Sequence, residues 1–315
     1  MAARVERAAT VLRGHVRHTP LLASPWLSAA TGGEVRLKCE NLQHTGSFKV
    51  RGATHALAQL SAEQRRAGVV AASSGNHGLG VAAAARQLGT SALVFVPETT
   101  PAKKRARILE AGAQVQVFGD DCVLTEQEAR RVAAASGRAY VSPYNDLEVI
   151  AGQGTVAVEL LAFWPQVEVV YVALGGGGLI AGMAAYAKSL LPQVEFVACS
   201  PLASPAMAEC VRQGRIVDVP CAPTLSDSTA GGVEPGAITF DLCRQLVDRF
   251  VEVDEAAIAA AVVTALAEER QLLEGAAGVA IAGLLADPAG RGRRAAVLAC
   301  GGNLSLDKLQ GLLTS

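Results

Sequence analysis

The chain has few aromatic residues and almost no excess of charge of either sign. Only 4% of its 315 residues are aromatic, and 28 basic residues nearly balance 29 acidic ones. A chain without a charge excess has no electrostatic footprint for nucleic acid or for a membrane surface. We therefore expect neither as a partner, and we expect an aliphatic core.

Closely spaced cysteine pairs are also absent. The seven cysteines are odd in number, scattered, and never arranged as C-x-x-C. This distribution disfavours a disulfide framework and a structural zinc site, and it favours a reducing cytoplasm. Charged residues near the N-terminus precede any apolar run, so no secretory signal is expected. The uncharged stretch at 169–187 is long enough to span a bilayer, but four consecutive glycines favour a strand, a turn and a helix.

What the chain does have is apolar content and glycine: half of its residues are hydrophobic and 32 are glycine. Its length predicts two domains or one large α/β unit. Three apolar runs end in Gly-rich turns and continue as helices of small residues. Such turns lie at the carboxyl ends of parallel strands, where ligands bind, so they indicate one composite site. The runs are 69–72, 169–174 and 296–299, and the turns are 73–78, 175–178 and 300–303.

Short strand-like and helix-like segments alternate between the first two turns, which predicts a compact β/α insert. We expect residues 51–145 to form a small substrate-loop domain, and residues 1–50 with 146–315 to form a large one. A cleft between two such lobes is a natural place for a small ligand. The expected strands are 92–96, 114–118 and 139–142, and the expected helices are 101–111 and 121–135.

Lys49 is the first candidate for chemistry, because it follows Ser47 and Phe48 at an expected helix start. Ser47 can cap the helix, and Phe48 can supply an apolar wall. A lysine held in an apolar cleft has its charged form disfavoured, which lowers its pKa and makes the amine nucleophilic. A lone lysine is more often a solvated surface residue, so the neighbours decide between the two interpretations.

The block around Lys49 resembles a known cofactor-attachment signature. Residues 40–53 follow the pattern E-N-x-Q-x-T-G-S-F-K-x-R-G-A, which resembles that of the serine/threonine dehydratase family. The resemblance covers nearly the whole chain. It implies a two-lobed α/β fold of the tryptophan-synthase β-like type (fold type II), with mostly parallel sheets flanked by helices. It also implies that Lys49 forms a Schiff base with pyridoxal 5′-phosphate and that Phe48 lies in the cofactor site.

The glycine string allows two interpretations. Gly176-x-Gly178-x-x-Ala181 fits a loose dinucleotide fingerprint, but the acid meant to hold the ribose, Glu195, begins its expected strand instead of ending it. The alternative is a phosphate cup, in which glycine N–H groups at a helix N-terminus approach a phosphate. In the resembled family the string GGGGL binds the cofactor phosphate, which assigns Gly175, Gly176, Gly177, Gly178 and Leu179 to that role.

The turn at 73–78 has the sequence S-S-G-N-H-G. Taken alone, it fits a helix cap as well as an anion site. It resembles the family's substrate loop, which grips the amino-acid carboxylate and whose asparagine hydrogen-bonds the phenolic oxygen of the cofactor. Ser74 matches a serine that faces the cofactor opposite the lysine in serine racemases, so it is a candidate catalytic residue. The implied substrate-binding residues are Ser73, Ser74, Gly75, Asn76 and His77.

Cys300 ends the third apolar run, and a small buried cysteine is its simplest interpretation. The resemblance places Cys300 at the pyridine nitrogen of the cofactor, and Glu274 near the same ring edge. A thiol, whose ordinary pKa is about 8.5, is a poor partner for a protonated pyridine. This favours β-elimination over reactions that need a stronger electron sink.

Two segments depart from the family pattern. Ser200 and Ala206 stand where cation-binding members place carboxylates, so we expect no metal there. Residues 226–236 resemble the corresponding loop of dehydratases associated with hydroxyectoine utilisation. The substrate therefore need not be plain threonine.

The resemblance implies a cytoplasmic homo-oligomer, a dimer by family likeness, with a small amino-acid substrate. The expected reaction converts a β-hydroxy amino acid such as L-threonine or L-serine to a 2-oxo acid and ammonia by β-elimination. Racemisation of serine is an alternative, as is a hydroxyectoine-derived or 3-hydroxyaspartate-type substrate. From other classes, a nicotinamide dehydrogenase and a catalytically silent ligand-binding protein also stay open.

Overall fold

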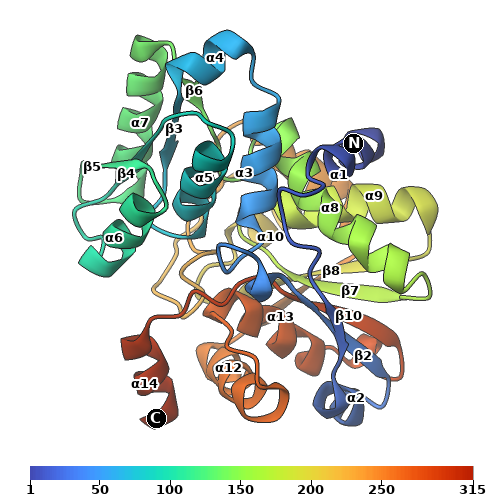
Figure 1. Ribbon diagram of the computed structural model, residues 1–315. Helices are drawn as coiled ribbons and strands as arrows, with labels where there is room; N and C mark the ends of the chain where they lie inside the picture. The colour runs from blue at the N-terminus through green and yellow to red at the C-terminus, as the bar shows by residue number, and fades with distance from the viewer. Residues whose placement is uncertain (315) are drawn as a thin grey trace.

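The structure is a computed structural model that describes residues 1–314. Its strands form two separate sheets with helices on their faces (Figure 1). The strands of the larger sheet are β1 (Leu21–Ala23), β2 (Glu34–Cys39), β7 (Val169–Ala173), β8 (Glu195–Pro201), β9 (Arg249–Val253) and β10 (Arg294–Ala299). Those of the smaller sheet are β3 (Val69–Ala72), β4 (Ala92–Val96), β5 (Gln114–Val117) and β6 (Ala139–Tyr140).

Helices connect nearly all of these strands, as expected for parallel sheets. Those before β7 are α1 (Ala2–Val11), α2 (Pro25–Thr31), η1 (Glu40–Leu42), α3 (Lys49–Ala58), α4 (Ala62–Ala67), α5 (Asn76–Gln87), α6 (Ala102–Glu110), α7 (Cys122–Ser136) and α8 (Leu147–Phe163). Those after β7 are α9 (Gly178–Leu190), α10 (Ala206–Gln213), α11 (Ile238–Leu246), α12 (Glu255–Glu269), α13 (Gly275–Ala286), η2 (Pro288–Gly290) and α14 (Leu306–Thr314).

Most neighbouring strands run parallel. The larger sheet has the order β1-β2-β10-β7-β8-β9 and the smaller one β5-β4-β3-β6, and only β1 and β2 pair antiparallel. Strands β7 and β10 are buried almost throughout, because α9 and α13 pack on opposite faces of the sheet (Figure 1). The predicted α/β fold class with mostly parallel sheets is confirmed.

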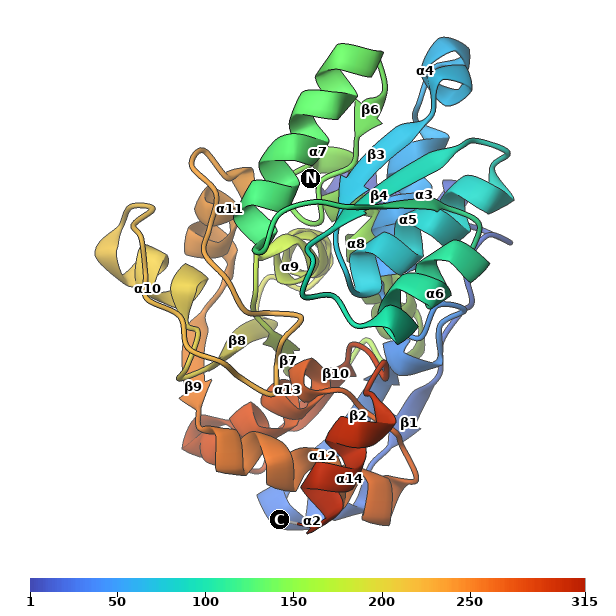
Figure 2. The ribbon, with the colours of Figure 1, turned by 90° about the vertical axis from the view of Figure 1, so that its left-hand side faces the viewer.

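The smaller sheet is also covered on both faces. Val70 and Phe95 pack against α7, whereas their chain neighbours Val69 and Val94 pack in the core that α3 and α5 share. This alternation follows from the two-residue period of a strand. Figure 2 shows α7 and α5 on opposite sides of this sheet. We retain 51–145 as the proposed small domain, because all four strands lie within it.

Three parallel strands that lie side by side bring distant segments together. Strands β2, β10 and β7 are neighbours, with Cys39 opposite Ala299 and Tyr171 opposite Val297. Their carboxyl ends therefore meet at one edge of the sheet. The segment that leads to Lys49, the residue Cys300, and the glycine turn before α9 all emerge at this edge.

Some local expectations differ from the structure: the bounds of α6, β5 and α7 shift by one residue, and two differences are larger. The strand expected at 139–142 ends at Tyr140. Ser47 does not cap α3: the N-cap is Phe48, and the buried Ser47 hydroxyl has no hydrogen-bond partner among residues 1–314. Ser47 forms a β-bridge with Gly301, so its backbone is used to join two strand ends. The stretch at 169–187 is β7, a turn and most of α9, and no described helix is long and apolar enough to cross a membrane.

Candidate active site

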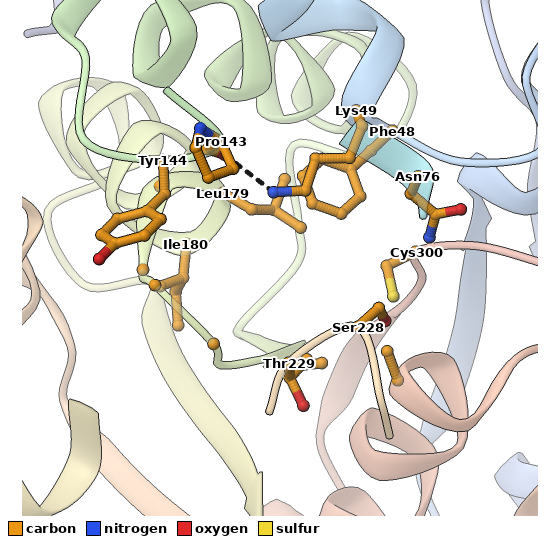
Figure 3. Close-up of a pocket in the computed structure, with 16 residues that line it drawn as sticks. Phe48, Lys49, Asn76, Pro143, Tyr144, Leu179, Ile180, Ser228, Thr229 and Cys300 are labelled. Atoms are coloured by element: carbon orange, nitrogen blue, oxygen red, sulfur yellow. Dashed lines mark hydrogen bonds between the residues drawn. The ribbon is translucent and has the colours of Figure 1, made fainter. Parts of the chain in front are cut away.

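Segments from both sheets line one cavity at the ends of β3, β6, β7 and β10 (Figure 3). The cavity holds about 510 Å³ of empty space, which includes its open mouth. The lining residues are Phe48, Lys49, Asn76, Pro143, Tyr144, Ala173, Gly175, Gly176, Gly177, Gly178, Leu179, Ile180, Ser228, Thr229, Ala276 and Cys300.

Lys49 directs its amine into this cavity. Its Nζ donates a hydrogen bond of 2.8 Å to the carbonyl oxygen of Pro143 and lies 5.3 Å from the centre of the Phe48 ring (Figure 3). Burial lowers the pKa of Lys49 to about 8, although Cys300 and Glu274 partly oppose the shift. A substantial fraction of the amine is therefore neutral and nucleophilic near neutral pH.

A buried ion-pair cluster fixes the start of α3 and hence Lys49. Arg51 is 1% exposed, and its guanidinium donates at 2.7 Å to Glu40 and at 2.7 Å to Glu159 of α8. Lys38 of β2 contacts the same Glu159 carboxylate at 2.6 Å. The first turn of α3 is thus bonded directly to η1 and α8, and through Glu159 to Lys38 of β2, which holds the start of α3 and Lys49 in place.

The glycine turn presents backbone to the cavity. Gly177 has φ +84°, a left-handed conformation that favours glycine, and it is the N-cap of α9. A Cβ on Gly176 would lie 2.3 Å from the ring of Tyr144, so only glycine allows this close packing. The first N–H groups of α9 lack partners within the helix and carry partial positive charge. The turn can therefore bind an anion such as a phosphate.

Asn76 is held in one orientation by two partners. Its Nδ2 donates to Glu274 Oε1 at 2.8 Å, and its Oδ1 accepts from Asn303 Nδ2 at 2.6 Å. Ser228 Oγ donates to the same Glu274 oxygen at 3.2 Å. Burial raises the pKa of Glu274, although the hydrogen bond from Asn76 opposes the shift. One N–H of the Asn76 amide is then left for a ligand in the cavity.

Cys300 follows β10 and lines the same cavity. Its carbonyl accepts from the backbone N–H of Phe48 at 3.1 Å, which ties it to the segment that carries Lys49. Burial raises the pKa of the Cys300 thiol well above its ordinary value, so the thiol is neutral near pH 7. A neutral sulfur places no negative charge on this side of the cavity.

The structure does not bring every predicted residue to the cavity wall. Asn76 lines the cavity, whereas Ser73, Ser74 and Gly75 precede it in the turn between β3 and α5 and do not line it. His77 is buried, and its Nε2 contacts the carbonyl oxygen of Val141 at 2.9 Å. Burial lowers the pKa of His77 to about 3, so the ring is neutral. The substrate-binding role of this turn stays a prediction.

Sequence analysis missed Pro143 and Tyr144. Pro143 accepts the hydrogen bond from Lys49, and the Tyr144 hydroxyl accepts from the backbone N–H of Glu234 at 3.0 Å. The available signal was their position, because both follow β6 at the carboxyl end of a parallel strand. In the described range, no group of three or more His, Cys, Asp or Glu side chains is placed to hold a metal ion.

Comparison with known proteins gives consistent matches. Over residues 12–301 the sequence matches the family described as "Pyridoxal-phosphate dependent enzyme". The L-threonine ammonia-lyase of Thermotoga maritima is 40% identical over 309 residues, covering 98% of this chain and 77% of the relative. Maize serine racemase superposes with a TM-score of 0.94 at 29% identity, covering 99% and 96% of the two chains. The processed form of threonine deaminase isoform 2 from Solanum lycopersicum superposes with a TM-score of 0.92 at 29% identity, covering 100% and 94%.

The residues around the cavity fit pyridoxal phosphate. A partly neutral amine at Lys49 suits its aldehyde, and the side-chain-free turn before α9 suits its phosphate. Asn76 retains a free N–H, and Cys300 supplies a neutral thiol. Family match, fold and cavity therefore agree on the cofactor. The chain belongs to the serine/threonine dehydratase family of pyridoxal-phosphate-dependent enzymes.

Proposed function

We propose that the chain is an ammonia-lyase that converts a β-hydroxy amino acid such as L-threonine or L-serine to a 2-oxo acid and ammonia. The observation that carries this proposal is the Lys49 amine, which lines the same cavity as the glycine turn and has a pKa lowered to about 8. The 40% identity to an L-threonine ammonia-lyase supports the same reaction.

Lys49 has two tasks in the proposed reaction. Pyridoxal phosphate, when bound, supplies an electron sink for the α-carbon of the amino acid. Lys49 Nζ holds the cofactor through its aldehyde and, once freed, removes the α-proton as a general base. The carbonyl of Pro143, which accepts from Nζ at 2.8 Å, orients the amine and restricts the positions from which it can take up the proton.

The surrounding residues favour β-elimination over reactions that need a stronger electron sink. The neutral Cys300 thiol stands at the position that the family resemblance matches to the pyridine nitrogen, where other pyridoxal-phosphate enzymes place a carboxylate that strengthens the electron sink. Asn76, oriented by Glu274 and Asn303, presents a donor to the cavity. The glycine turn binds the phosphate and anchors the cofactor.

Several finer points also remain proposals. The substrate turn at 73–77 would bind the carboxylate of the amino acid through its hydroxyls and the N-terminus of α5. A cytoplasmic homodimer follows from the family resemblance, and the seven free thiols suit a reducing compartment. The amino-acid panel described below compares threonine, serine and 3-hydroxyaspartate as substrates, and a hydroxyectoine-derived amino acid is the further candidate.

Serine racemisation is the second candidate, because the structure superposes on maize serine racemase with a TM-score of 0.94. Racemisation needs a proton donor on the face opposite Lys49, and Ser74 is the candidate. Incubation with L-serine followed by chiral analysis separates the two reactions. Accumulation of D-serine faster than pyruvate would favour racemisation.

The decisive experiment combines trapping and turnover. Borohydride treatment of the cofactor-loaded protein should remove its visible absorbance and leave the reduced cofactor covalently attached to Lys49. A panel of threonine, serine and 3-hydroxyaspartate should yield keto acid with the wild type and none with Lys49→Ala. The exposed Lys103 provides the control, because Lys103→Ala should retain the reduced cofactor on Lys49. Reduced cofactor on another lysine, or formation of keto acid by Lys49→Ala, would refute the role proposed for Lys49.

A further inference from the structure

The segment 226–236, which lies between α10 and α11, carries two cavity residues without belonging to a helix or strand. Ser228 and Thr229 line the cavity, and Ser228 Oγ donates to Glu274 at 3.2 Å. Thr229 Oγ1 lies 2.6 Å from Ser226 Oγ within the segment. The bond between Ser226 and Thr229 shapes a turn, and the bond to Glu274 ties this turn to the large lobe but not to the small one.

Asp227, next to Ser228, is bound by lysines from two other elements. Its Oδ2 accepts from Lys308 of α14 at 2.9 Å and from Lys104 of α6 at 3.3 Å. Figure 2 shows the segment running near α6 of the small lobe and near α14. Burial raises the pKa of Asp227, but the two lysines more than offset it and lower the pKa overall. The carboxylate is therefore charged near neutral pH.

The other end of the segment is tied to the small lobe as well. Glu234 pairs with Arg130 of α7 at 2.6 Å, and its backbone N–H donates to Tyr144 Oη at 3.0 Å. A bond of 2.8 Å from Arg107 of α6 to Asn303 adds a second link between α6 and the large lobe. Asp227 is distinctive because one carboxylate joins α6, the segment and α14.

We propose that Asp227 is a positioning residue for the substrate pocket. Held by Lys104 and Lys308, it keeps Ser228 against Glu274 and ties the small lobe to the wall of the cavity. This inference rests on the proposed function, since the pocket is the one in which the amino acid would bind. The three side chains are 38% to 48% exposed, so each ion pair is weak and is screened by salt.

The experiment compares Asp227→Asn, Lys104→Met and Lys104→Arg with the wild type, all loaded with cofactor. Lys188→Met is the matched control. Lys188 forms an ion pair with Asp248, with 2.6 Å between Nζ and Oδ1, and neither residue lines the cavity. Amide hydrogen exchange of peptides from 225–236 reports how firmly the segment is held, independently of turnover. Steady-state kinetics with threonine or serine, at about 0.05 M and about 0.5 M salt, report KM and kcat separately.

We expect Asp227→Asn to speed exchange of the segment by about two- to tenfold, the size set by the loss of two exposed ion pairs. KM should rise by a similar factor, while kcat changes by less than about twofold, because the contact acts on ground state and transition state alike. High salt should move the wild type towards the variant and leave the variant nearly unchanged. Lys104→Arg should behave like the wild type, and Lys104→Met should lie between the wild type and Asp227→Asn.

Three results would overturn the inference. The first is an unchanged exchange rate of residues 225–236 in Asp227→Asn. The second is an equal change of exchange rate and KM in Lys104→Arg and Lys104→Met, and the third is faster exchange of the segment in Lys188→Met. If none of the β-hydroxy amino acids tested yields a keto acid, the proposed function is refuted instead. The exchange measurement would still decide whether Asp227 holds the segment.

Discussion

The lowered pKa of Lys49 predicts how fast the apo-protein takes up pyridoxal phosphate as pH changes. Only a neutral amine attacks an aldehyde, and burial lowers the pKa of Lys49 to about 8. At pH 7, about one Lys49 side chain in ten is then neutral. For an ordinary lysine, with a pKa of about 10.4, the neutral fraction is roughly one in 2,500. The cavity therefore makes this amine about 250 times more available at neutral pH.

The assay follows the visible absorbance of the attached cofactor after mixing apo-protein with pyridoxal phosphate between pH 6 and pH 10. The rate should rise about tenfold from pH 6 to pH 7 and level off above about pH 9. A small amine measured in parallel corrects for titration of the aldehyde itself. A rate that still rises about sevenfold between pH 9 and pH 10 would show that Lys49 has an ordinary pKa of about 10.4, which would refute the reasoning from burial.

The same property has a consequence for stability. A charged Lys49 is disfavoured in the folded apo-protein but not in the unfolded chain, so the folded pKa lies below the unfolded one. The penalty is full below about pH 8 and disappears as pH rises towards about 10.4, where the unfolded lysine also loses its proton. Apo Lys49→Met should therefore resist urea better than apo wild type at pH 7, with the difference closing at high pH.

Three further predictions concern close packing and buried charge. Gly176→Ala should weaken binding of pyridoxal phosphate at equilibrium and cost about 1–3 kcal/mol of unfolding free energy, because its Cβ would lie 2.3 Å from an aromatic ring. Gly311→Ala, whose Cβ would meet no atom of residues 1–314 within 4 Å, should leave both quantities nearly unchanged. Glu40→Gln should lower the unfolding free energy by about 3–5 kcal/mol in urea titrations, because it breaks the fully buried ion pair with Arg51. Glu34→Gln, which breaks the exposed pair with Arg36, should lower it by less than about 1 kcal/mol. Equal losses in the two glutamate variants would contradict the role assigned to burial.

Much of the fold could be predicted from the sequence, because parallel strands leave a local pattern. The runs at 69–72 and 92–96 coincide with β3 and β4, since continuous aliphatic segments buried on both faces are bounded by glycine or polar turns. Glu195 begins β8, as expected, which is the wrong end of a strand for holding a ribose. Helix α7 starts one residue after the expected position, at a cap formed by Asp121.

Local rules failed where a residue's partner lies far away in the chain. Ser47 has the right type and place to cap α3, yet a β-bridge to Gly301 takes its backbone away from that role. The cap rule considers only the next few residues, whereas the bridge depends on β2 and β10 being neighbours. Asp227 shows the same limit, since nothing near it in sequence indicates that Lys104 and Lys308 approach it.

The glycine string shows why the candidate site could be predicted only in part. Glycine at 176 is required by the ring of Tyr144, which packs where a Cβ would stand, and glycine at 177 by a left-handed backbone. Neither requirement involves a phosphate, although the resulting turn leaves the amides of α9 open to one. A run of glycines therefore indicates that something approaches the backbone closely, but not what approaches. Only the packing of the segment after β6 against the turn identifies Tyr144 as one of the groups that approach it, and no local pattern encodes this contact between the two lobes.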